Sequence, residues 1–252
     1  MTYTLLKLIW RTICIFEMLI FNQFLYMLTL FPTFIVQKLQ PVYFYLSRIW
    51  ARLFVRALGV DLRLHEKNTK PLPSHYILVA NHPSAFEDIG IPALFPVRSL
   101  SKIGVRDWWF AGRITWAAGN LFVKRESRES RHRVYKEMIA AVESGKNIAV
   151  YPEGGCKGRR IFETFRYGAF DISIKTGVPI LPVFLHYEMQ DLFEWRSPQT
   201  VYHKIWHIMF CQNNRANYYV YDAIDPAGFK DKVEYMEHVH DLYLKWQARY
   251  LD

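Results

Sequence analysis

Residues 76–88, YILVANHPSAFED, are the part of the chain on which the predicted fold depends. The apolar run 76–80 has the length of a buried strand and ends at a polar Asn-His pair. Pro83 disfavours helical backbone at His82 and suits the first turn of a new helix. We therefore place His82 in the bend between the carboxyl end of a strand and the start of a helix, where residues of open α/β sheets face a crevice.

Two carboxylates, Glu87 and Asp88, follow this histidine closely. In a helix that begins near Ser84, side chains tilt toward the amino terminus, so Glu87 leans back toward His82. An imidazole held by a carboxylate is typical of a general base. The alternative is that His82 only ends the strand and the two acids lie on a solvated helix face.

Composition indicates an anionic partner in a reducing compartment. The chain has 252 residues, is 51% apolar and 17% aromatic, and carries a formal charge of +9. Residues 101–166 hold fourteen Lys/Arg and seven Asp/Glu, a net of +7. Such an excess suits a phosphorylated substrate, a nucleotide-like carrier, an anionic membrane or nucleic acid. Cys14, Cys156 and Cys211 are scattered and odd in number, which argues against a disulfide framework or a zinc site.

The N-terminal region is predicted to associate with a membrane. Residues 12–36 contain one charge, Glu17, and are long enough to cross a bilayer as a helix. Three interpretations remain: a segment that dips into one leaflet or lies at the interface, a spanning helix, or a buried helix of a soluble protein. Residues 42–60 carry arginines at 48, 52 and 56, either facing lipid headgroups or on a surface helix packed on the core.

The remaining pattern predicts an α/β fold with a mostly parallel central sheet flanked by helices and an N-terminal membrane-associated helical segment. Strands are expected at 76–80, 97–102, 121–123, 148–151 and 180–185, with a late β pair at 202–211 and 216–221. Helices are expected at 127–143, 167–175 and 231–250. The predicted domains are a membrane-associating helical region over 1–60 and a catalytic domain over 61–252.

Several of these strands end in cations or glycines that a parallel sheet brings to one edge. Lys124-Arg125 follow the third strand, and Glu153-Gly154-Gly155 follow the fourth, with Lys157, Arg159 and Arg160 next. Gly154-Gly155 permit an anion-binding nest of backbone N–H groups, or form an ordinary tight turn. Lys124-Arg125 suit a phosphate, or form a solvated pair. Cys156, beside cations, and Ser84 are weaker candidates for a nucleophile, because the sequence anchors no second histidine and has no G-x-S-x-G elbow.

Four blocks in this order resemble the glycerolipid acyltransferases of the 1-acylglycerol-3-phosphate acyltransferase (PlsC-like) superfamily. Residues 81–84 with Glu87 are similar to the NHxSxxD block, and residues 119–125, GNLFVKR, fit G-x-x-F-[IV]-x-R. Residues 151–154, YPEG, resemble F-P-E-G, and residues 178–183, VPILPV, resemble V-P-I-x-P-V. The likeness covers about residues 75–190. Two departures stand out: Glu87 replaces the family's aspartate, and Gly155-Cys156 replace the Thr-Arg usual after F-P-E-G.

The resemblance implies direct acyl transfer from acyl-CoA or acyl carrier protein to the hydroxyl of a lysophospholipid, lysophosphatidate-like acceptor. His82 would be the general base and Glu87, favoured over Asp88 by spacing, its partner. The residues that would bind the acceptor are Gly119, Phe122, Arg125, Glu153 and Gly154. No metal and no cofactor beyond the acyl donor are implied, and the site is expected at a membrane, on its cytoplasmic side.

Two rival functions remain open on the sequence. A lipid hydrolase or transacylase would use the same base on water or on another lipid. A non-catalytic basic membrane-binding protein would use only the charge and the apolar segment. Nucleic acid is not expected as a partner, because no recognised binding motif occurs and the basic residues gather at strand ends. No pattern in the chain specifies an oligomeric state.

Overall fold

The computed structural model describes residues 2–156, 158, 160–194, 200–211 and 213–251. The chain forms two compact units: residues 1–60 with 88–134, and residues 61–87 with 135–252. The predicted division at residue 60 stays a prediction. Within each unit, neighbouring strands pair mostly in parallel and helices pack beside them, so the predicted α/β fold class is confirmed.

The first unit contains the N-terminal helices and one strand pair. Its elements are α1 (Thr2–Leu28), α2 (Thr33–Lys38), α3 (Gln40–Leu58), α4 (Glu87–Leu94, whose first residue belongs to the second unit), β3 (Arg98–Lys102), α5 (Ile103–Arg106), α6 (Trp109–Ala117), β4 (Leu121–Val123) and the start of α7 (Arg128–Glu143). The strands β3 and β4 are parallel, with Ser101 opposite Phe122. Both strands were predicted to within one residue.

Helix α1 packs one side against α3 and exposes the other. Asn22 accepts a hydrogen bond from the Trp50 indole at 3.0 Å, and Glu17 forms an ion pair with Arg56 at 3.2 Å. The exposed face is apolar and includes Leu5, Leu6, Ile9, Ile13, Phe16, Leu19, Ile20, Phe24 and Met27. By length and composition, Leu8–Leu28 is able to cross a membrane. These exposed side chains argue against a buried helix of a soluble protein and indicate membrane association.

All three spaced arginines of α3 have partners within the unit, and two of them bind the end of α4. Arg52 donates from Nε to the carbonyl of Ala93 at 3.0 Å, and Arg48 donates to the carbonyls of Pro92 and Leu94. Both guanidinium groups therefore satisfy carbonyls at the end of α4, which have no partner within that helix. The interpretation of this row as a headgroup-facing stripe does not hold for these two residues.

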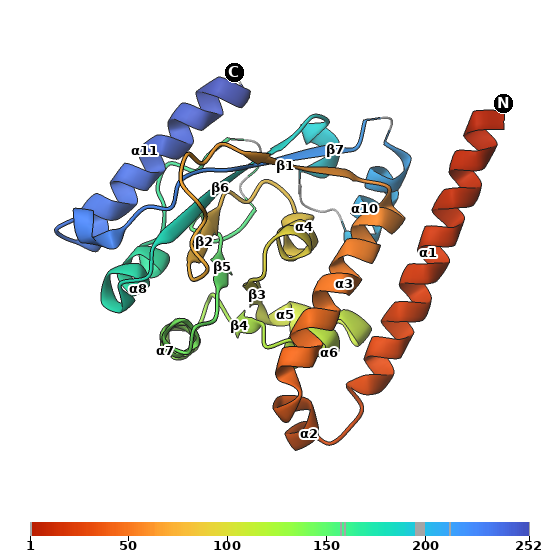
Figure 1. Cartoon of the computed structure of the whole chain (residues 1–252), viewed down its shortest axis with the longest axis horizontal. Coiled ribbons are helices and arrows are strands. Elements are labelled where there is room, and N and C mark those ends of the chain that lie inside the picture. Colours follow the sequence, from red (N-terminus) through yellow and green to blue (C-terminus); the bar gives the residue numbers. More distant parts are fainter. Residues whose placement is uncertain (1, 157, 159, 195–199, 212, 252) are drawn as a thin grey trace. The chain divides into compact units, whose positions relative to one another are not determined.

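The second unit is built on a sheet with strand order β1-β7-β6-β2-β5. Its elements are β1 (Asp61–Glu66), β2 (Ile77–Ala80), the end of α7, β5 (Ile148–Val150), α8 (Gly168–Thr176), β6 (Ile180–Tyr187), α9 (Gln190–Phe193), α10 (Val201–Phe210), β7 (Arg215–Val220), η1 (Pro226–Gly228) and α11 (Lys232–Tyr250). The strand β2 lies between β5 and β6 and is parallel to both, and β6 and β7 are antiparallel. Figure 1 shows α8 and α11 beside β6.

The core of this unit lies around β2 and β6. All four residues of β2 are fully buried, as expected of an apolar strand in the middle of a parallel sheet. On one face of β6, Phe184 packs against Trp246 and Tyr250 of α11. On the opposite face, Tyr187 stacks on Phe193 at 4.4 Å between ring centroids. This alternation follows the two-residue period of a strand.

One sequence prediction in this unit was wrong, and one strand was not predicted. Residues 202–211, predicted as the first strand of a late β pair, lie almost entirely in helix α10 (Val201–Phe210). Aromatic and β-branched residues suggested a strand, but the aromatic side chains recur every fourth residue, which is a helical period. Strand β1 was not predicted, since its exposed pattern lacks the apolar run of a core strand. It is held by parallel pairing with β7, about 150 residues later in the chain.

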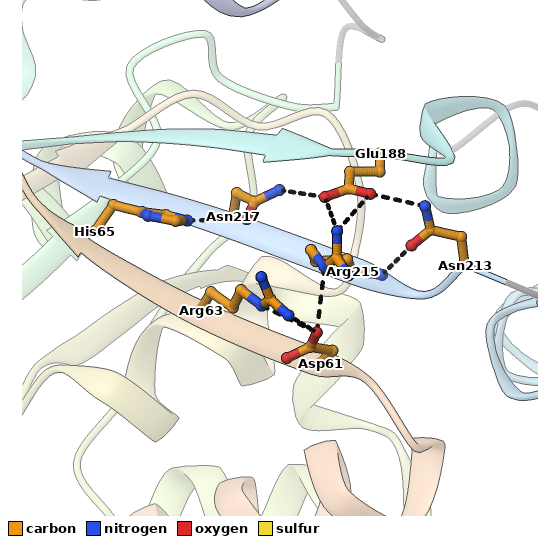
Figure 2. Close-up of polar contacts among 7 residues, drawn as sticks. All are labelled: Asp61, Arg63, His65, Glu188, Asn213, Arg215 and Asn217. Atoms are coloured by element: carbon orange, nitrogen blue, oxygen red, sulfur yellow. Dashed lines mark hydrogen bonds and ion pairs between the residues drawn. The ribbon is translucent and has the colours of Figure 1, made fainter.

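A polar network ties this edge of the sheet together (Figure 2). Arg215 of β7 forms ion pairs with Asp61 of β1 at 3.2 Å and with Glu188, which follows β6, at 2.8 Å. Asn213 and Asn217 also donate to Glu188. These donors hold the pKa of Glu188 at about 2, with the Asn213 hydrogen bond as the largest cause. These ion pairs and hydrogen bonds thus help to hold β1 on the sheet, because this edge strand buries little apolar surface.

Candidate active site

His82 lies where the sequence places it, just past the carboxyl end of β2. Asn81 fixes this bend: its amide donates to the carbonyl of Leu185 at 3.0 Å and accepts from the Leu185 N–H at 2.7 Å. The side chain thereby replaces a backbone partner at the end of the β2–β6 ladder. His82 is only 5% exposed, so its ring occupies a defined place in the fold.

Glu87 lies within ion-pair distance of the imidazole. Its Oε1 is 3.7 Å from Nδ1 of His82, and both side chains are buried. The same oxygen accepts the backbone N–H of Ser84 at 2.6 Å, while the Ser84 hydroxyl accepts the N–H of Phe86. Ser84 and Glu87 thus close the turn that precedes α4 through these two hydrogen bonds. Asp88 is half-buried.

Burial is the dominant influence on the Glu87 carboxyl. It raises the pKa of Glu87 well above its usual range, and hydrogen bonds from its own N–H, the Ser84 N–H and the Tyr187 hydroxyl oppose that rise. A buried carboxylate is stabilised by a cation, so protonation of His82 favours the ionised form of Glu87. Proton uptake by the imidazole is therefore coupled to the charge on this acid.

Two further side chains touch the imidazole. Tyr151, directly after β5, stacks on it with ring centroids 4.2 Å apart and planes at 11°. The Sγ atom of Cys156 lies 3.4 Å from Nε2 and donates to the carbonyl of Ser84 at 3.1 Å. Glu87 thus faces one ring nitrogen and a thiol faces the other. This contact was not predicted, because it depends on the path of the chain after Gly154.

Glu153 holds the backbone of the histidine. Its Oε1 accepts the N–H of His82 at 2.8 Å, and its side chain is 3% exposed. Gly154 follows with φ +76°, and a Cβ at this position would lie 2.2 Å from Nε of Arg166. Only glycine fits both the backbone conformation and the space. Four predicted site residues, His82, Glu87, Glu153 and Gly154, therefore gather in the second unit.

The other three predicted residues belong to the first unit. Gly119 has φ +83° and would meet Arg98 if it carried a Cβ. Phe122 is 8% exposed, so its ring belongs to the packed interior of that unit. Arg125 is half-buried, and its carbonyl accepts from Arg131. Since these residues and His82 belong to different compact units, their role at the site stays a prediction.

The donor set around His82 does not resemble a metal site. Within the described ranges, which omit 157, 159, 195–199 and 212, His, Cys, Asp and Glu side chains form no group of three suited to a metal ion. Lys157 and Arg159, predicted to add positive charge after Gly154, lie outside the described residues.

Comparison with known proteins assigns the chain to a family. A family model described as Acyltransferase matches residues 61–186, half of the chain. The chain belongs to the acyltransferase family. This confirms the resemblance inferred from the four sequence blocks, and the matched range includes both the His82 bend and the turn at Glu153.

Several acyltransferases are similar to this one in sequence. A lyso-ornithine lipid O-acyltransferase of Pseudomonas aeruginosa is 29% identical over 61% of this chain and 58% of its own length. A 1-acyl-sn-glycerol-3-phosphate acyltransferase of Haemophilus influenzae is 28% identical over 68% of each. Human lysophosphatidylcholine acyltransferase 2 is 27% identical over 62% of this chain and 29% of its own length. The match thus spans about three fifths to two thirds of the two bacterial relatives.

The fold also occurs in a solved acyltransferase. The crystal structure of the 1-acyl-sn-glycerophosphate acyltransferase PlsC from Thermotoga maritima superposes with a TM-score of 0.65 at 16% identity. The superposition covers 97% of this chain and 96% of that one. At this identity the likeness concerns the fold.

Proposed function

We propose that this acyltransferase moves a fatty acyl group from a thioester donor, acyl-CoA or acyl carrier protein, to the hydroxyl of a lysophospholipid or related lysolipid. The observation that carries the proposal is the His82–Glu87 pair at the carboxyl end of a buried parallel strand. The names of the relatives, which act on lyso-ornithine lipid, 1-acylglycerol 3-phosphate and lysophosphatidylcholine, support a lysolipid acceptor.

In the proposed reaction, His82 is the general base. Its Nε2 takes the proton of the acceptor hydroxyl, the oxygen attacks the thioester carbonyl, and the C–S bond breaks. Glu87, on the Nδ1 side, keeps the imidazole in one tautomer and stabilises the imidazolium that forms. The leaving thiolate, from a thiol of pKa about 8.5, takes up the proton from the imidazolium, so the reaction requires no metal and no cofactor beyond the donor.

Glu153 has a positioning role in this proposal in place of substrate contact. Its carboxylate oxygen accepts the N–H of His82, so it holds the backbone from which the base projects. Gly154 remains a proposed acceptor-binding residue in the next turn, and Arg125 with Gly119 and Phe122 remain the proposed acceptor-binding residues of the first unit. The exposed apolar face of α1 supports access to lipid substrates from a membrane, with the site on the cytoplasmic side.

The contact between Cys156 and Nε2 favours a second candidate, in which an acyl-enzyme forms. The Cys156 thiol would give its proton to His82 and attack the donor thioester, and the leaving thiolate would take that proton. His82 would then take the proton of the acceptor hydroxyl, and the oxygen would attack the new thioester on Cys156. The C–S bond would break, and the Cys156 thiolate would leave and take up that proton. Direct transfer is preferred, because exchanging one thioester for another adds a step without lowering the energy of the acyl group.

The test is an acceptor panel with purified full-length protein in phospholipid vesicles. Two donors, labelled acyl-CoA and acyl carrier protein loaded with a labelled acyl group, are each incubated with 1-acylglycerol 3-phosphate, lyso-ornithine lipid and lysophosphatidylcholine. We expect a labelled diacyl lipid with at least one of them. Thiol release that is independent of every lysolipid would favour a hydrolase. Absence of both product and thiol release, with lipid binding intact, would favour the membrane-binding protein.

A further inference from the structure

Helix α10 in the second unit is held by one side, and this contact determines which side faces outward. The Thr200 hydroxyl caps the helix by accepting the N–H of His203 at 3.3 Å. Lys204 and Ile208, one turn apart, are each 4% exposed. The ammonium of Lys204 donates inward to the carbonyl of Leu192 at 2.8 Å. One side of α10 is therefore anchored in the unit, and the opposite side points to the surroundings.

Three large aromatic side chains form a row on this outer side. Tyr202, Trp206 and Phe210 are spaced by four and are 84%, 63% and 59% exposed. The rings of Trp206 and Phe210 are 4.4 Å apart, so part of the row is a single surface. Over residues 202–210, the other exposed residues of the helix are His203 and His207, and the sequence of the helix contains no Asp or Glu. Exposed aromatic side chains in such a row indicate a binding surface.

The area of the aromatic row favours contact with a lipid membrane over contact with a protein partner. Side chains of this kind bury about 200 Å² each, so the row offers on the order of 400–500 Å². A stable protein interface needs roughly 800 Å² and 20–30 residues from each partner. A helix lying in the headgroup region of a bilayer needs only one apolar face, with aromatic rings at the level of the headgroups. The exposed apolar face of α1 already indicates that the chain works at a membrane.

We propose that α10 is a second lipid-contacting element, which inserts Tyr202, Trp206 and Phe210 into the headgroup region of the membrane. The absence of acidic residues from the helix suits a surface that carries anionic headgroups. The contact belongs to the second unit, which also contains His82 and Glu87. It brings that unit to the surface in which lipid substrates are dissolved, and it holds whether or not the proposed reaction is correct.

Photo-crosslinking tests this inference without an activity assay. The photoreactive residue p-benzoylphenylalanine replaces Trp206 in the full-length protein, which is bound to vesicles of phosphatidylcholine and phosphatidylglycerol and irradiated. Tyr202, the most exposed member of the row, is replaced in a second variant, so that the test survives if the first fails to fold. Phe16 on α1 is the positive control, and Leu244 on α11, 39% exposed, is the matched control in the second unit.

We expect lipid adducts at 202 and 206, as at 16, and none at 244. Two results would overturn the proposal: lipid adducts at 16 without any at 202 and 206, or equal adducts at 244. Covalent dimers formed at 206 in place of lipid adducts would assign the surface to a second copy of the chain, which also contradicts a lipid contact.

Discussion

The two ring nitrogens of His82 meet different neighbours, and this asymmetry defines the chemistry at the residue scale. Nδ1 faces the buried carboxyl of Glu87 at 3.7 Å, and Nε2 faces the Cys156 thiol at 3.4 Å. Stacking on Tyr151 and the bond from the His82 N–H to Glu153 limit rotation of the ring and movement of its backbone. In the proposed reaction, the acceptor hydroxyl approaches on the Nε2 side, next to the Cys156 thiol.

The substitution Glu87→Gln separates the charge of this residue from the hydrogen bond that it accepts from the Ser84 N–H, in the turn before α4. The amide oxygen of the introduced glutamine is still able to accept the Ser84 N–H. The imidazolium loses its counter-charge, so we expect kcat to fall on the order of 10²-fold or more. Asp88→Asn is the matched control, and equal large losses in both variants would contradict the assignment of Glu87. Steady-state kinetics in vesicles measure both.

The same substitution has a predicted effect on the pH dependence of stability. Burial raises the pKa of Glu87, so folding favours its protonated form. The stability that this preference adds to the folded state is fully present below the unfolded pKa, about 4.3. It is lost as the pH rises toward the folded pKa. The glutamine side chain does not ionise. The Tm of E87Q relative to the native protein should therefore rise between pH 5 and pH 8, as measured by thermal unfolding. A relative Tm that falls over this range would contradict the stated direction.

Cys156 decides between direct transfer and an acyl-enzyme. With direct transfer, Cys156→Ala and Cys156→Ser keep most of the transfer activity, and labelled CoA does not exchange into acyl-CoA without acceptor. With an acyl-enzyme, exchange occurs in the native protein and disappears in Cys156→Ala. Cys211→Ala is the control for general effects of removing a thiol. We expect no exchange, and exchange that depends on Cys156 would replace the direct mechanism.

Helices and strands show how far the sequence determines local structure. The strand β2 and helices α7 and α11 were predicted closely, because their apolar patterns are strong and local. Strand β1 was not predicted, because it depends on pairing with β7, which is distant in the sequence. Helix α10 was not predicted, because it has apolar residues on both of its faces. Around His82, the strand end and the Glu87 spacing were readable, but the Tyr151 stack and the Cys156 contact arise only when distant segments fold together.

The arginines of α3 are predicted to stabilise the end of α4. Arg52→Met keeps much of the aliphatic stem but removes a charged donor to the Ala93 carbonyl, so we expect a loss of about 1 kcal/mol in unfolding free energy, because Arg52 is exposed to solvent. Arg56→Met breaks only a half-exposed pair with Glu17, which we expect to cost less than about 1 kcal/mol. Denaturant titration compares them. Vesicle binding that falls in R52M without a loss of stability would instead support a headgroup-facing arginine.

The polar network at the edge of the sheet is predicted to weaken in acid. Since the pKa of Glu188 is about 2 in the folded chain, its contribution is full above its unfolded pKa, about 4.3, and is lost as pH falls toward 2. Glu188→Gln should lower stability by on the order of 1 kcal/mol at pH 7, because solvent screens this partly exposed site. The difference in stability between the native protein and Glu188→Gln should become smaller as the pH falls from about 4.5 to about 2. Glu143→Gln, exposed on α7, is the control, and a deficit that is constant with pH would contradict the assigned cause.

On the scale of the whole molecule, the family match spans residues 61–186 and so includes parts of both compact units. The second unit holds the proposed base, its acid and the proposed lipid-contacting helix, while the first unit holds α1 and the predicted acceptor-binding Arg125. The family resemblance of the sequence blocks predicted that His82, Glu87 and Arg125 belong to one functional site. Composition and periodicity alone gave the fold class but not which residues meet.

The proposed role of His82 as the general base for acyl transfer is tested by single-turnover kinetics of His82→Ala. The variant is bound to vesicles with labelled acyl donor and the preferred lysolipid, and thermal unfolding and vesicle flotation confirm that it folds and binds membranes. We predict that the acyl-transfer step slows by on the order of 10²–10⁴-fold with donor binding unchanged. A folded, membrane-bound H82A protein that transfers acyl groups at the native rate would contradict the account.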